Sequence, residues 1–279
     1  MDYHADRFDD CSLLVCDGGR PLALLPAHAA GDRVVSHGGL TYGGFVVDDG
    51  MTAALMLELF DAAAAELRRS GFTSMLYKTI PHIYHRAPAE EDLYALFRAG
   101  ARLVRRDQLA VIDYRAPLER QERRQRGVRK GAKLGLDVRE TGDFAAYWEI
   151  LSENLLSRYG VRPVHTLEEI ALLRSRFPER IRLFAAYDGE AMCAGVVIYV
   201  SDCVCHAQYI GSTAAGREQG ALDALFDHLI GAFAGAARYF DFGTSTERGG
   251  AHLNAGLAAF KEGFGARTVV HDHYEVTLA

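Results

Sequence analysis

The chain has 279 residues, of which 49% are hydrophobic and 24% charged, and its formal net charge is −6. This is the composition of a globular protein with one large domain or two modest ones. The negative charge argues against a protein whose main role is to coat nucleic acid, so nucleic acid is not an expected partner.

The sequence indicates neither export nor membrane insertion. Its polar, acidic beginning lacks a secretory signal pattern. The most apolar helical stretch, 221–237, is interrupted by Asp223, Asp227 and His228, so we expect no membrane span. Five cysteines without a C-x-x-C pair suggest neither a disulfide framework nor a zinc site. Free thiols fit a reducing cytosol, and we expect a cytoplasmic protein.

The first part of the chain alternates strand and helix signals. Asp17-Gly18 between two apolar runs predicts a β-hairpin over 12–27. The other expected elements are an extended run over 34–47, a helix over 51–70, a strand over 72–80, a loop over 81–85, a helix over 90–99 and two short strands over 102–114.

The second part repeats this order of elements. Asp188-Gly189 again joins two strands, 171 residues after Asp17, and Phe260 follows Phe97 by 163 residues. Six elements in the same order favour two copies of one α/β unit. The expected elements are a hairpin over 182–198, a strand over 206–211, a helix over 220–237, a strand over 239–243, a short helix over 257–263 and a strand over 267–278.

A basic segment, 115–139, separates the two copies. It is either a solvated charged helix or a clamp for an anionic substrate, because guanidinium groups pair bidentately with phosphate. An amphipathic helix over 143–156 follows, whose aromatic face is expected in the core. Thr166 and Glu169 fit a capping box that opens a helix through Phe177.

The stretch 203–226 passes from a strand through a glycine-rich turn into a helix. Such a turn exposes backbone N–H groups, and the helix N-terminus adds about half a positive charge, which favours phosphate binding. A strand–turn–helix unit that binds nothing is the alternative. The phosphate interpretation assigns contacts to Gly216, Arg217, Gly220 and Ala221.

Several tracts resemble the tandem GNAT proteins, which include Fem-type aminoacyl transferases of cell-wall assembly and sugar N-acyltransferases of polysaccharide gene clusters. The resemblance to the whole group is carried by Tyr239–Glu247, Gly256–Gly265 and Arg126–Lys133. The tracts that look more like the sugar N-acyltransferases are His206–Ile210, Gly39–Gly44 and Pro81–His85.

This resemblance implies an α/β (α+β) fold of two GNAT-like units, each a mixed, mostly antiparallel sheet flanked by helices. The units are expected at 1–114 on the acceptor side and 141–279 on the acyl-donor side, with 115–140 as a basic linker. The family implies acyl-CoA as the donor, bound in the C-terminal copy, and an acceptor in the cleft between the copies. The phosphate loop departs from the family's pattern, because Leu222 stands where a small residue is usual.

Acyl transfer to an amine needs a base, oxyanion donors and close positioning of the reactants. In a GNAT unit the strand before the phosphate loop splays open, which places the oxyanion donors near Tyr209 and Ile210. His206 shares a strand face with Gln208 and is the first candidate base, the alternative being a packed structural histidine. Glu247 is the second, the alternative being a helix N-cap formed with Thr244 and Ser245.

The candidate substrate contacts lie in both copies. Asp241 binds a sugar hydroxyl or pairs with Arg267, and Lys261 meets a phosphate or lies on a solvated face. Thr244, Ser245 and Asn254 are further candidates. In the first copy, aromatic, histidine and lysine side chains suit a nucleotide-linked sugar: His37, Thr41, Tyr42, Lys78, Tyr84 and His85.

Metal and thiol chemistry receive less support from the spacing. Cys205 and His206 are adjacent on a strand and point to opposite faces, so a thiolate–imidazole pair is not expected. His271 and His273 share a face, as metal ligands do, but no third ligand has a sensible spacing in the sequence, and no metal is expected.

Three functions are compatible with these residues. The first is an N-acyltransferase that moves an acyl group from acyl-CoA to the amine of a nucleotide-linked amino sugar by direct attack on the thioester. The second keeps the fold but uses aminoacyl-tRNA as the donor. The third is a GNAT-fold binding protein without catalysis.

Overall fold

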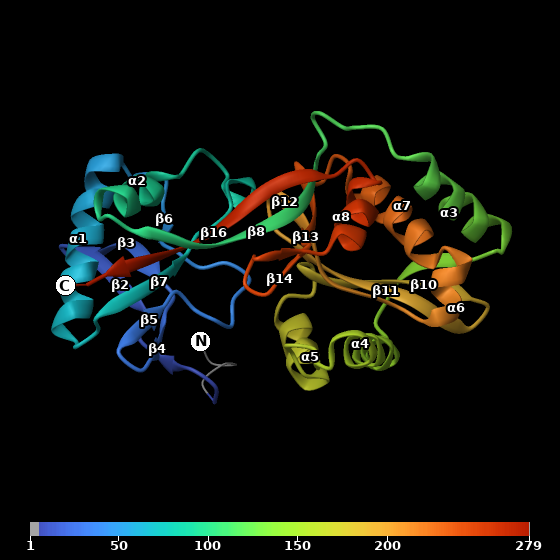
Figure 1. Ribbon diagram of the computed structural model, residues 1–279, viewed down its shortest axis with the longest axis horizontal. Helices are drawn as coiled ribbons and strands as arrows, with labels where there is room; N and C mark the ends of the chain where they lie inside the picture. Colours follow the sequence, from blue (N-terminus) through green and yellow to red (C-terminus); the bar gives the residue numbers. More distant parts are fainter. Residues whose placement is uncertain (1–5, 279) are drawn as a thin grey trace. The chain divides into compact units, whose positions relative to one another are not determined.

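The structure is a computed structural model that describes residues 6–278, apart from the side chains of residues 158 and 159. The chain forms two compact units (Figure 1). The first unit contains Met1–Gln108, Thr246–Leu253 and Val270–Ala279, and the second contains Leu109–Ser245 and Asn254–Val269. This division differs from the expected one because two strands, β8 and β16, contribute residues to both units.

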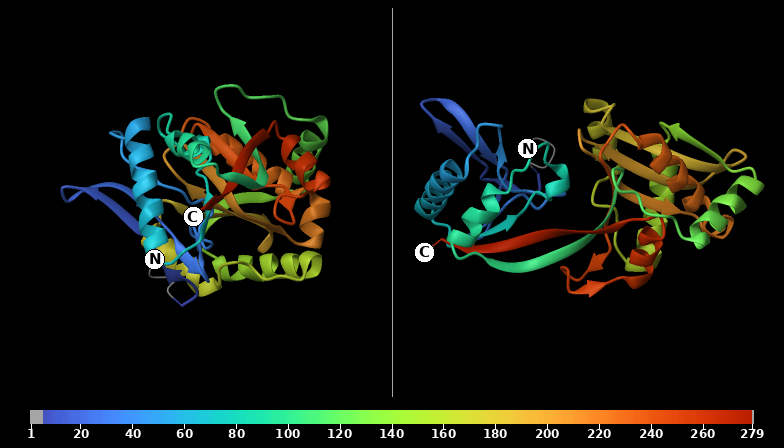
Figure 2. Two further views of the ribbon diagram at one scale, coloured as in Figure 1. Left: turned by 60° about the vertical axis from the view of Figure 1, so that its left-hand side comes forward. Right: turned by 90° about the horizontal axis from the view of Figure 1, so that it is seen from above.

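In the first unit, the C-terminal strand β16 runs between β7 and β8 (Figure 2). The strand order is β1 (Asp9–Asp10), β4 (His28–Ala30), β5 (Arg33–Val35), β7 (Ser74–Lys78), β16 (Arg267–Thr277) and β8 (Arg102–Asp113). A separate sheet holds β2 (Leu13–Asp17), β3 (Arg20–Leu25) and β6 (Val46–Val47), and β14 (Thr246–Glu247) pairs with β15 (His252–Leu253).

Two α-helices of the first unit close its core. Within the described residues they are α1 (Ala53–Arg69) and α2 (Glu91–Arg98), and a 3₁₀ turn spans His82–Tyr84. Leu59 and Phe60 of α1 pack with Tyr77 of β7 and Leu96 of α2. Thr52 caps α1 by accepting a hydrogen bond from the Leu55 N–H.

In the second unit, the strand order is β8, β13 (Tyr239–Thr244), β12 (Val204–Ser212), β11 (Ala191–Val200), β10 (Ile181–Asp188) and β9 (Asp137–Thr141). Only the β12–β13 pair of this series is parallel. The helices are α3 (Glu122–Lys133), α4 (Phe144–Tyr159), α5 (Leu167–Arg176), α6 (Ala214–Gln219), α7 (Ala221–Phe233) and α8 (Ala255–Glu262).

Helices cover both faces of these strands. On one face, Leu225 and Phe226 of α7 pack against Cys205 and Ala207 of β12. Helices α4 and α5 lie on the opposite side of β10–β12 (Figure 1). Since successive strand residues alternate between faces, His206 points to the face opposite Cys205, as the sequence predicts, and therefore away from α7. Burial among apolar groups raises the pKa of the Cys205 thiol, which is consistent with a core cysteine.

Most local elements agree with expectation. Both hairpins form, and the capping box is complete, with Thr166 and Glu169 each bonding the other's backbone N–H. Three expectations were wrong. Residues 102–113 form one strand, the run over 34–47 is extended only at β5 and β6, and helix α7 ends at Phe233. Segment 122–133 is helix α3, which agrees with the charged helix that one interpretation of the basic segment expected.

The two hairpins occupy different places, although both turn at an Asp-Gly pair. The β2–β3 hairpin belongs to the separate three-stranded sheet of the first unit, whereas β10–β11 lies among the main strands of the second. The order of elements is therefore repeated in the two parts of the chain, but the strands with which each hairpin pairs are different. None of the helices within residues 6–278 combines the length and apolar character needed to cross a bilayer.

The close contact between α4 and β11 generates a stability prediction. A Cβ at Gly195 would lie 2.3 Å from Cδ2 of Tyr147, whose buried ring has no room to retreat. We expect Gly195→Ala to lower the free energy of unfolding by about 1–3 kcal/mol through overpacking. A Cβ at Gly231, on α7, would meet no atom within 4 Å, so Gly231→Ala should instead raise it by about 0.5–1 kcal/mol. Urea unfolding of both variants checks this, and equal midpoints would contradict it.

Candidate active site

Strands β12 and β13 separate part-way along their length. Their parallel register runs from Val204–Tyr239 to His206–Asp241, and no further rung between them occurs within the described residues. Beyond this point β12 stays paired with β11 but carries a bulge at Gln208. A bulge bends and twists its strand, which accounts for the separation. The split lies before Tyr209 and Ile210, on the strand for which the GNAT resemblance implied one.

A buried histidine–aspartate pair marks the last rung. His206 Nδ1 lies 2.9 Å from Asp241 Oδ2, and the two residues are 8% and 0% exposed. The Gly243 N–H donates to Asp241 Oδ1 over 2.7 Å. An ionised carboxylate only accepts hydrogen bonds, so it holds the proton on Nδ1 and makes Nε2 the basic nitrogen of His206.

Lys261 of α8 stabilises the end of β13. It is 2% exposed, and its Nζ donates to the carbonyl oxygens of Gly243 (3.0 Å) and Thr244 (2.6 Å). Burial lowers the pKa of Lys261 to about 8. The solvated-face interpretation of Lys261 was therefore wrong. Gly243 has φ +73°, and a Cβ there would lie 3.3 Å from Cε1 of His206, so glycine keeps the imidazole in place.

Asp241 does not pair with Arg267. Its carboxylate bonds His206 and Gly243, while the Arg267 guanidinium donates to the carbonyl of Ala266. The alternative interpretation of Asp241 as a partner of Arg267 was wrong, because Asp241 is fully buried whereas Arg267 is exposed.

One interpretation expected residues 244–247 to begin a helix, but they do not. Thr244 ends β13, Ser245 is buried, and Glu247 lies on β14 opposite His252, in the first unit. The helix begins at Ala255, and Asn254 caps it by accepting from the Leu257 N–H over 3.0 Å. Cap-forming residues suit turns and strand ends as well as helix starts, so the pattern was ambiguous.

The glycine-rich segment after β12 is partly helical. It forms the six-residue helix α6, whose first turn is capped by Thr213 accepting from the Gly216 N–H over 3.0 Å. A Cβ at Gly216 would lie 2.2 Å from the Cys193 carbonyl oxygen, so this position requires glycine. Arg217 Nη1 donates to the Ser212 carbonyl over 2.8 Å and thereby holds the end of β12.

Helix α3 covers the beginning of α7. Gly220 is left-handed, with φ +80°, and a Cβ there would lie 2.6 Å from the Gly127 carbonyl oxygen. Ala221 has no exposed surface. Arg124 is buried, donates to Asp223 over 2.7 Å and lies over the Phe260 ring. The basic segment thus has one face packed within the unit; Arg120 is half-buried and pairs with Asp227, and the other cations of the segment are exposed.

The contacts of Tyr209 were not foreseen, because no local sequence signal points to them. Its hydroxyl bonds the Nδ1 of His165, and Trp148 packs edge-on against its ring at 5.2 Å. The Trp148 Nε1 in turn donates to the His165 carbonyl over 3.2 Å. Asn154 of α4 donates to the Ser212 carbonyl over 2.8 Å. These residues come from α4 and the loop before α5, so only tertiary folding brings them to β12.

The candidate residues of the first unit gather around one loop. Lys78 is buried, its Nζ donates to the carbonyls of His37 (3.1 Å) and Leu40, and burial lowers its pKa to about 8. The rings of Tyr42 and Tyr84 lie 4.5 Å apart. The other candidates are the exposed Thr41 and the half-buried His85, whose pKa is lowered by burial.

Comparison with known protein families gives one match. The family described as "Acetyltransferase (GNAT) domain" matches residues 113–262, which is more than half of the chain. No curated protein matches the chain significantly.

Solved structures are similar to the chain over nearly its whole length. The C-terminal domain (DUF2156) of a putative lysylphosphatidylglycerol synthetase from Agrobacterium fabrum has a TM-score of 0.66 at 17% identity, covering 97% of this chain and 84% of that one. FemX has a TM-score of 0.67 at 10% sequence identity, and the match covers 98% of this chain and 89% of FemX. A tandem GNAT protein from the clavulanic acid biosynthesis pathway has a TM-score of 0.51 at 11% sequence identity, and the match covers 99% of this chain and 86% of that one. The expected mixed α/β fold, with tandem-GNAT neighbours, is confirmed.

The buried ammonium of Lys261 predicts a pH dependence of stability. The folded chain holds its proton only up to about pH 8, whereas the unfolded side chain holds it to about 10.5. Between these values the unfolded state binds more protons, so this residue's contribution to stability rises with pH. We expect the stability of wild type relative to Lys261→Met to increase across this window by up to about 3 kcal/mol. Denaturant unfolding at several pH values measures this difference in the free energy of unfolding. Lys133→Met, at an exposed position, is the control, and its difference from wild type should not increase across the same pH window.

Proposed function

The chain belongs to the acetyltransferase (GNAT) domain family and is an acyltransferase; from this premise we propose that it moves an acyl group from acyl-CoA to the amine of a nucleotide-linked amino sugar. The observation that supports this most directly is the His206–Asp241 pair at the last rung before β12 and β13 separate.

In the proposed reaction, Nε2 of His206 accepts a proton from the attacking amine. The amine nitrogen bonds the thioester carbonyl carbon, and the resulting oxyanion is stabilised near Tyr209 and Ile210. The C–S bond then breaks, and the leaving thiolate takes a proton. The Asp241 carboxylate holds the imidazole in position and stabilises its protonated form. A positioned base contributes about 10²–10⁴-fold to the rate.

We propose that the donor lies along β12 and reaches the segment after it. Gln208, Tyr209 and Ile210 follow the last rung, and α6 with the α7 start follows β12 directly. In this proposal the donor's phosphates meet the segment that holds Gly216, Arg217, Gly220 and Ala221. The exposed Arg217 supplies the positive charge.

The acceptor proposal rests on the first unit's loop. Neighbouring aromatic rings such as Tyr42 and Tyr84 suit a base or sugar ring, and exposed Thr41 offers a hydroxyl. In the proposal His37, Lys78 and His85 shape this surface, with Lys78 acting through the loop carbonyls that it holds. A second group of residues fixes the conformation of the chain at the end of β13 and the start of α8 in this proposal. These residues are Asp241, Thr244, Ser245, Asn254 and Lys261.

A second candidate function is favoured by the structural neighbours. FemX and the lysylphosphatidylglycerol synthetase domain resemble the chain, and the Fem-type resemblance implies an aminoacyl-tRNA donor. Helix α3 presents exposed cations that suit a polyanion: Arg123, Arg126, Arg129, Lys130 and Lys133.

The base assignment predicts a separation of binding from catalysis. We expect His206→Gln to lower kcat by about 10²–10⁴-fold while leaving the affinity for acetyl-CoA unchanged, because the imidazole moves a proton and does not hold the donor. Steady-state kinetics and calorimetry measure the two quantities. Glu247→Gln is the matched comparison: if it abolishes turnover and His206→Gln does not, Glu247 is the base and our assignment fails.

The donor is tested on the full chain. We expect saturable, one-site binding of acetyl-CoA by calorimetry, lost in Gly216→Val, since a side chain there meets the Cys193 carbonyl. Circular dichroism is the control for the folding of this variant. Activity that requires aminoacyl-tRNA and disappears after nuclease treatment would instead establish the second candidate. A folded chain that binds neither donor would overturn both.

A further inference from the structure

Three potential metal ligands meet in the first unit. Asp107 lies on β8, and His271 and His273 lie two positions apart on β16, with ring centroids 5.0 Å apart. All three are buried, and their ligand atoms lie within 4.8 Å of one another. The sequence indicated only the two histidines, because Asp107 joins them through the pairing of β8 with β16.

We propose that Asp107, His271 and His273 bind one divalent transition-metal ion, with Zn²⁺ as the expected occupant. Two imidazoles and one carboxylate are a donor set that Zn²⁺ and other first-row ions accept, leaving a position for water or another ligand. This site does not rest on the acyl-transfer proposal, because its three residues lie in the first unit.

The hydrogen bonds around the cluster already orient two of the ligands. His271 Nε2 lies 3.0 Å from the Thr79 carbonyl oxygen, which can only accept, so Nε2 carries the proton and Nδ1 keeps its lone pair. Thr246 Oγ1 donates to Asp107 Oδ1 over 2.8 Å. Metal-binding histidines and carboxylates commonly have such outer partners, which fix the ring and the tautomer.

His273 supplies an independent observation. Its side chain is 8% exposed, and its buried Nε2 has no hydrogen-bond partner within the described residues. The nearest carboxylate oxygen, Asp107 Oδ2, is 3.7 Å away. Buried polar atoms are nearly always satisfied, so a nitrogen in this position calls for a ligand. A metal ion between His273 and Asp107 would satisfy it.

One cation competes with a metal for the site. Arg105 Nε donates to Asp107 Oδ2 over 2.8 Å. Its side chain is 43% exposed, so it can turn toward solvent when an ion binds. Tetrahedral ligands about 2.1 Å from zinc lie about 3.4 Å apart, so the three side chains need to approach one another slightly. Because Arg105 competes with the ion for Asp107, its removal should strengthen metal binding. If the three residues had only a structural role, its removal would not have this effect.

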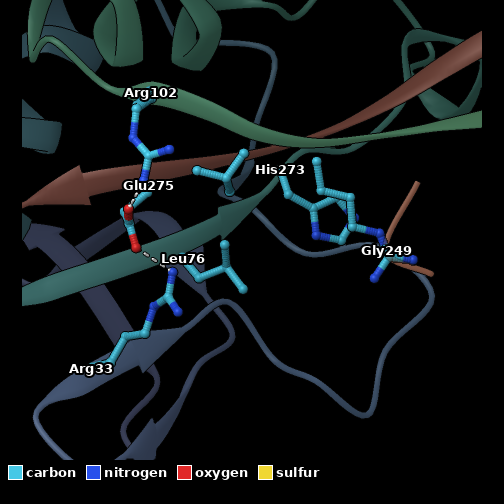
Figure 3. A pocket seen from close by; sticks show the side chains of 8 residues that line it. Arg33, Leu76, Arg102, Gly249, His273 and Glu275 are labelled. Carbon is cyan, nitrogen blue, oxygen red and sulfur yellow. Dashed lines mark hydrogen bonds and ion pairs between the residues drawn. The ribbon is translucent and has the colours of Figure 1, made fainter. Parts of the chain in front are cut away.

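An open pocket gives access to the cluster. His273 and Arg105 line a space of about 400 Å³ together with Gly249 and Leu76. Figure 3 shows Glu275 at this pocket between Arg102 and Arg33, with ion pairs to both. The pocket provides an entry path for an ion and space for the ligand that completes its coordination.

The experiment uses the full chain, stripped of metal with a chelator and desalted. Cobalt(II) is the probe, because its visible bands report tetrahedral coordination and thiolate ligands add separate ultraviolet bands. We expect one Co²⁺ per chain without thiolate bands, displacement by one equivalent of Zn²⁺, and an increase in Tm with either ion.

Variants identify the ligands. Asp107→Asn, which keeps an acceptor for Thr246, and His273→Leu should each weaken Co²⁺ binding at least about tenfold. Because His273 Nε2 lacks a partner, His273→Leu should fold. Arg105→Gln should tighten binding, and His252→Ala, an exposed histidine of the same unit, should not change it.

Two results would overturn the proposal. The first is a folded, stripped chain that shows no saturable Co²⁺ or Zn²⁺ binding. The second is binding that Asp107→Asn, His273→Leu and Arg105→Gln all leave unchanged, which would place the ion elsewhere, for example on the exposed Cys16. If a ligand variant fails to fold, Arg105→Gln still decides the question. A Co²⁺ affinity of Arg105→Gln equal to that of wild type would contradict competition between Arg105 and the ion for Asp107.

Discussion

The hydrogen bond between His206 and Asp241 lies on the last rung that β12 shares with β13. Before it, the two strands belong to a sheet with an apolar core; after it, the bulge at Gln208 and the left-handed Gly243 take the strands apart. A fully buried carboxylate is costly unless its oxygens are satisfied, and here His206 and the Gly243 N–H satisfy them. The geometry of the split and the orientation of the imidazole therefore depend on one buried pair.

Each unit also uses one buried lysine to hold a loop. Lys261 donates to two consecutive carbonyls at the end of β13, and Lys78 donates to two carbonyls of the 37–40 loop. Burial lowers the pKa of both to about 8, so each ammonium carries a desolvation cost that its carbonyl partners offset only in part. In both units, loop conformation near the candidate residues is stabilised by charge-assisted hydrogen bonds instead of apolar packing.

Two strands give the molecule its division into units. β8 and β16 each begin in one unit and end in the other, and residues 246–253, which contain β14 and β15, also belong to the first unit. The pairing of β8 with β16 also creates the Asp107–His271–His273 cluster, which no contiguous segment of the chain contains. A bound ion there would join these two strands directly. The acyltransferase family match covers 113–262 and so coincides largely with the second unit.

The sequence by itself determined the features that arise from local chemistry. The Asp-Gly hairpins, the capping box at Thr166 and the face of β12 that carries His206 follow from turn preferences and strand alternation, which involve neighbouring residues only. Tertiary structure decided which side chains meet: Asp241 for His206, the Gly243 carbonyl for Lys261, and Asp107 for the two histidines. These partners lie on strands and helices distant in sequence, and their meeting depends on strand order and register, which local preferences do not specify.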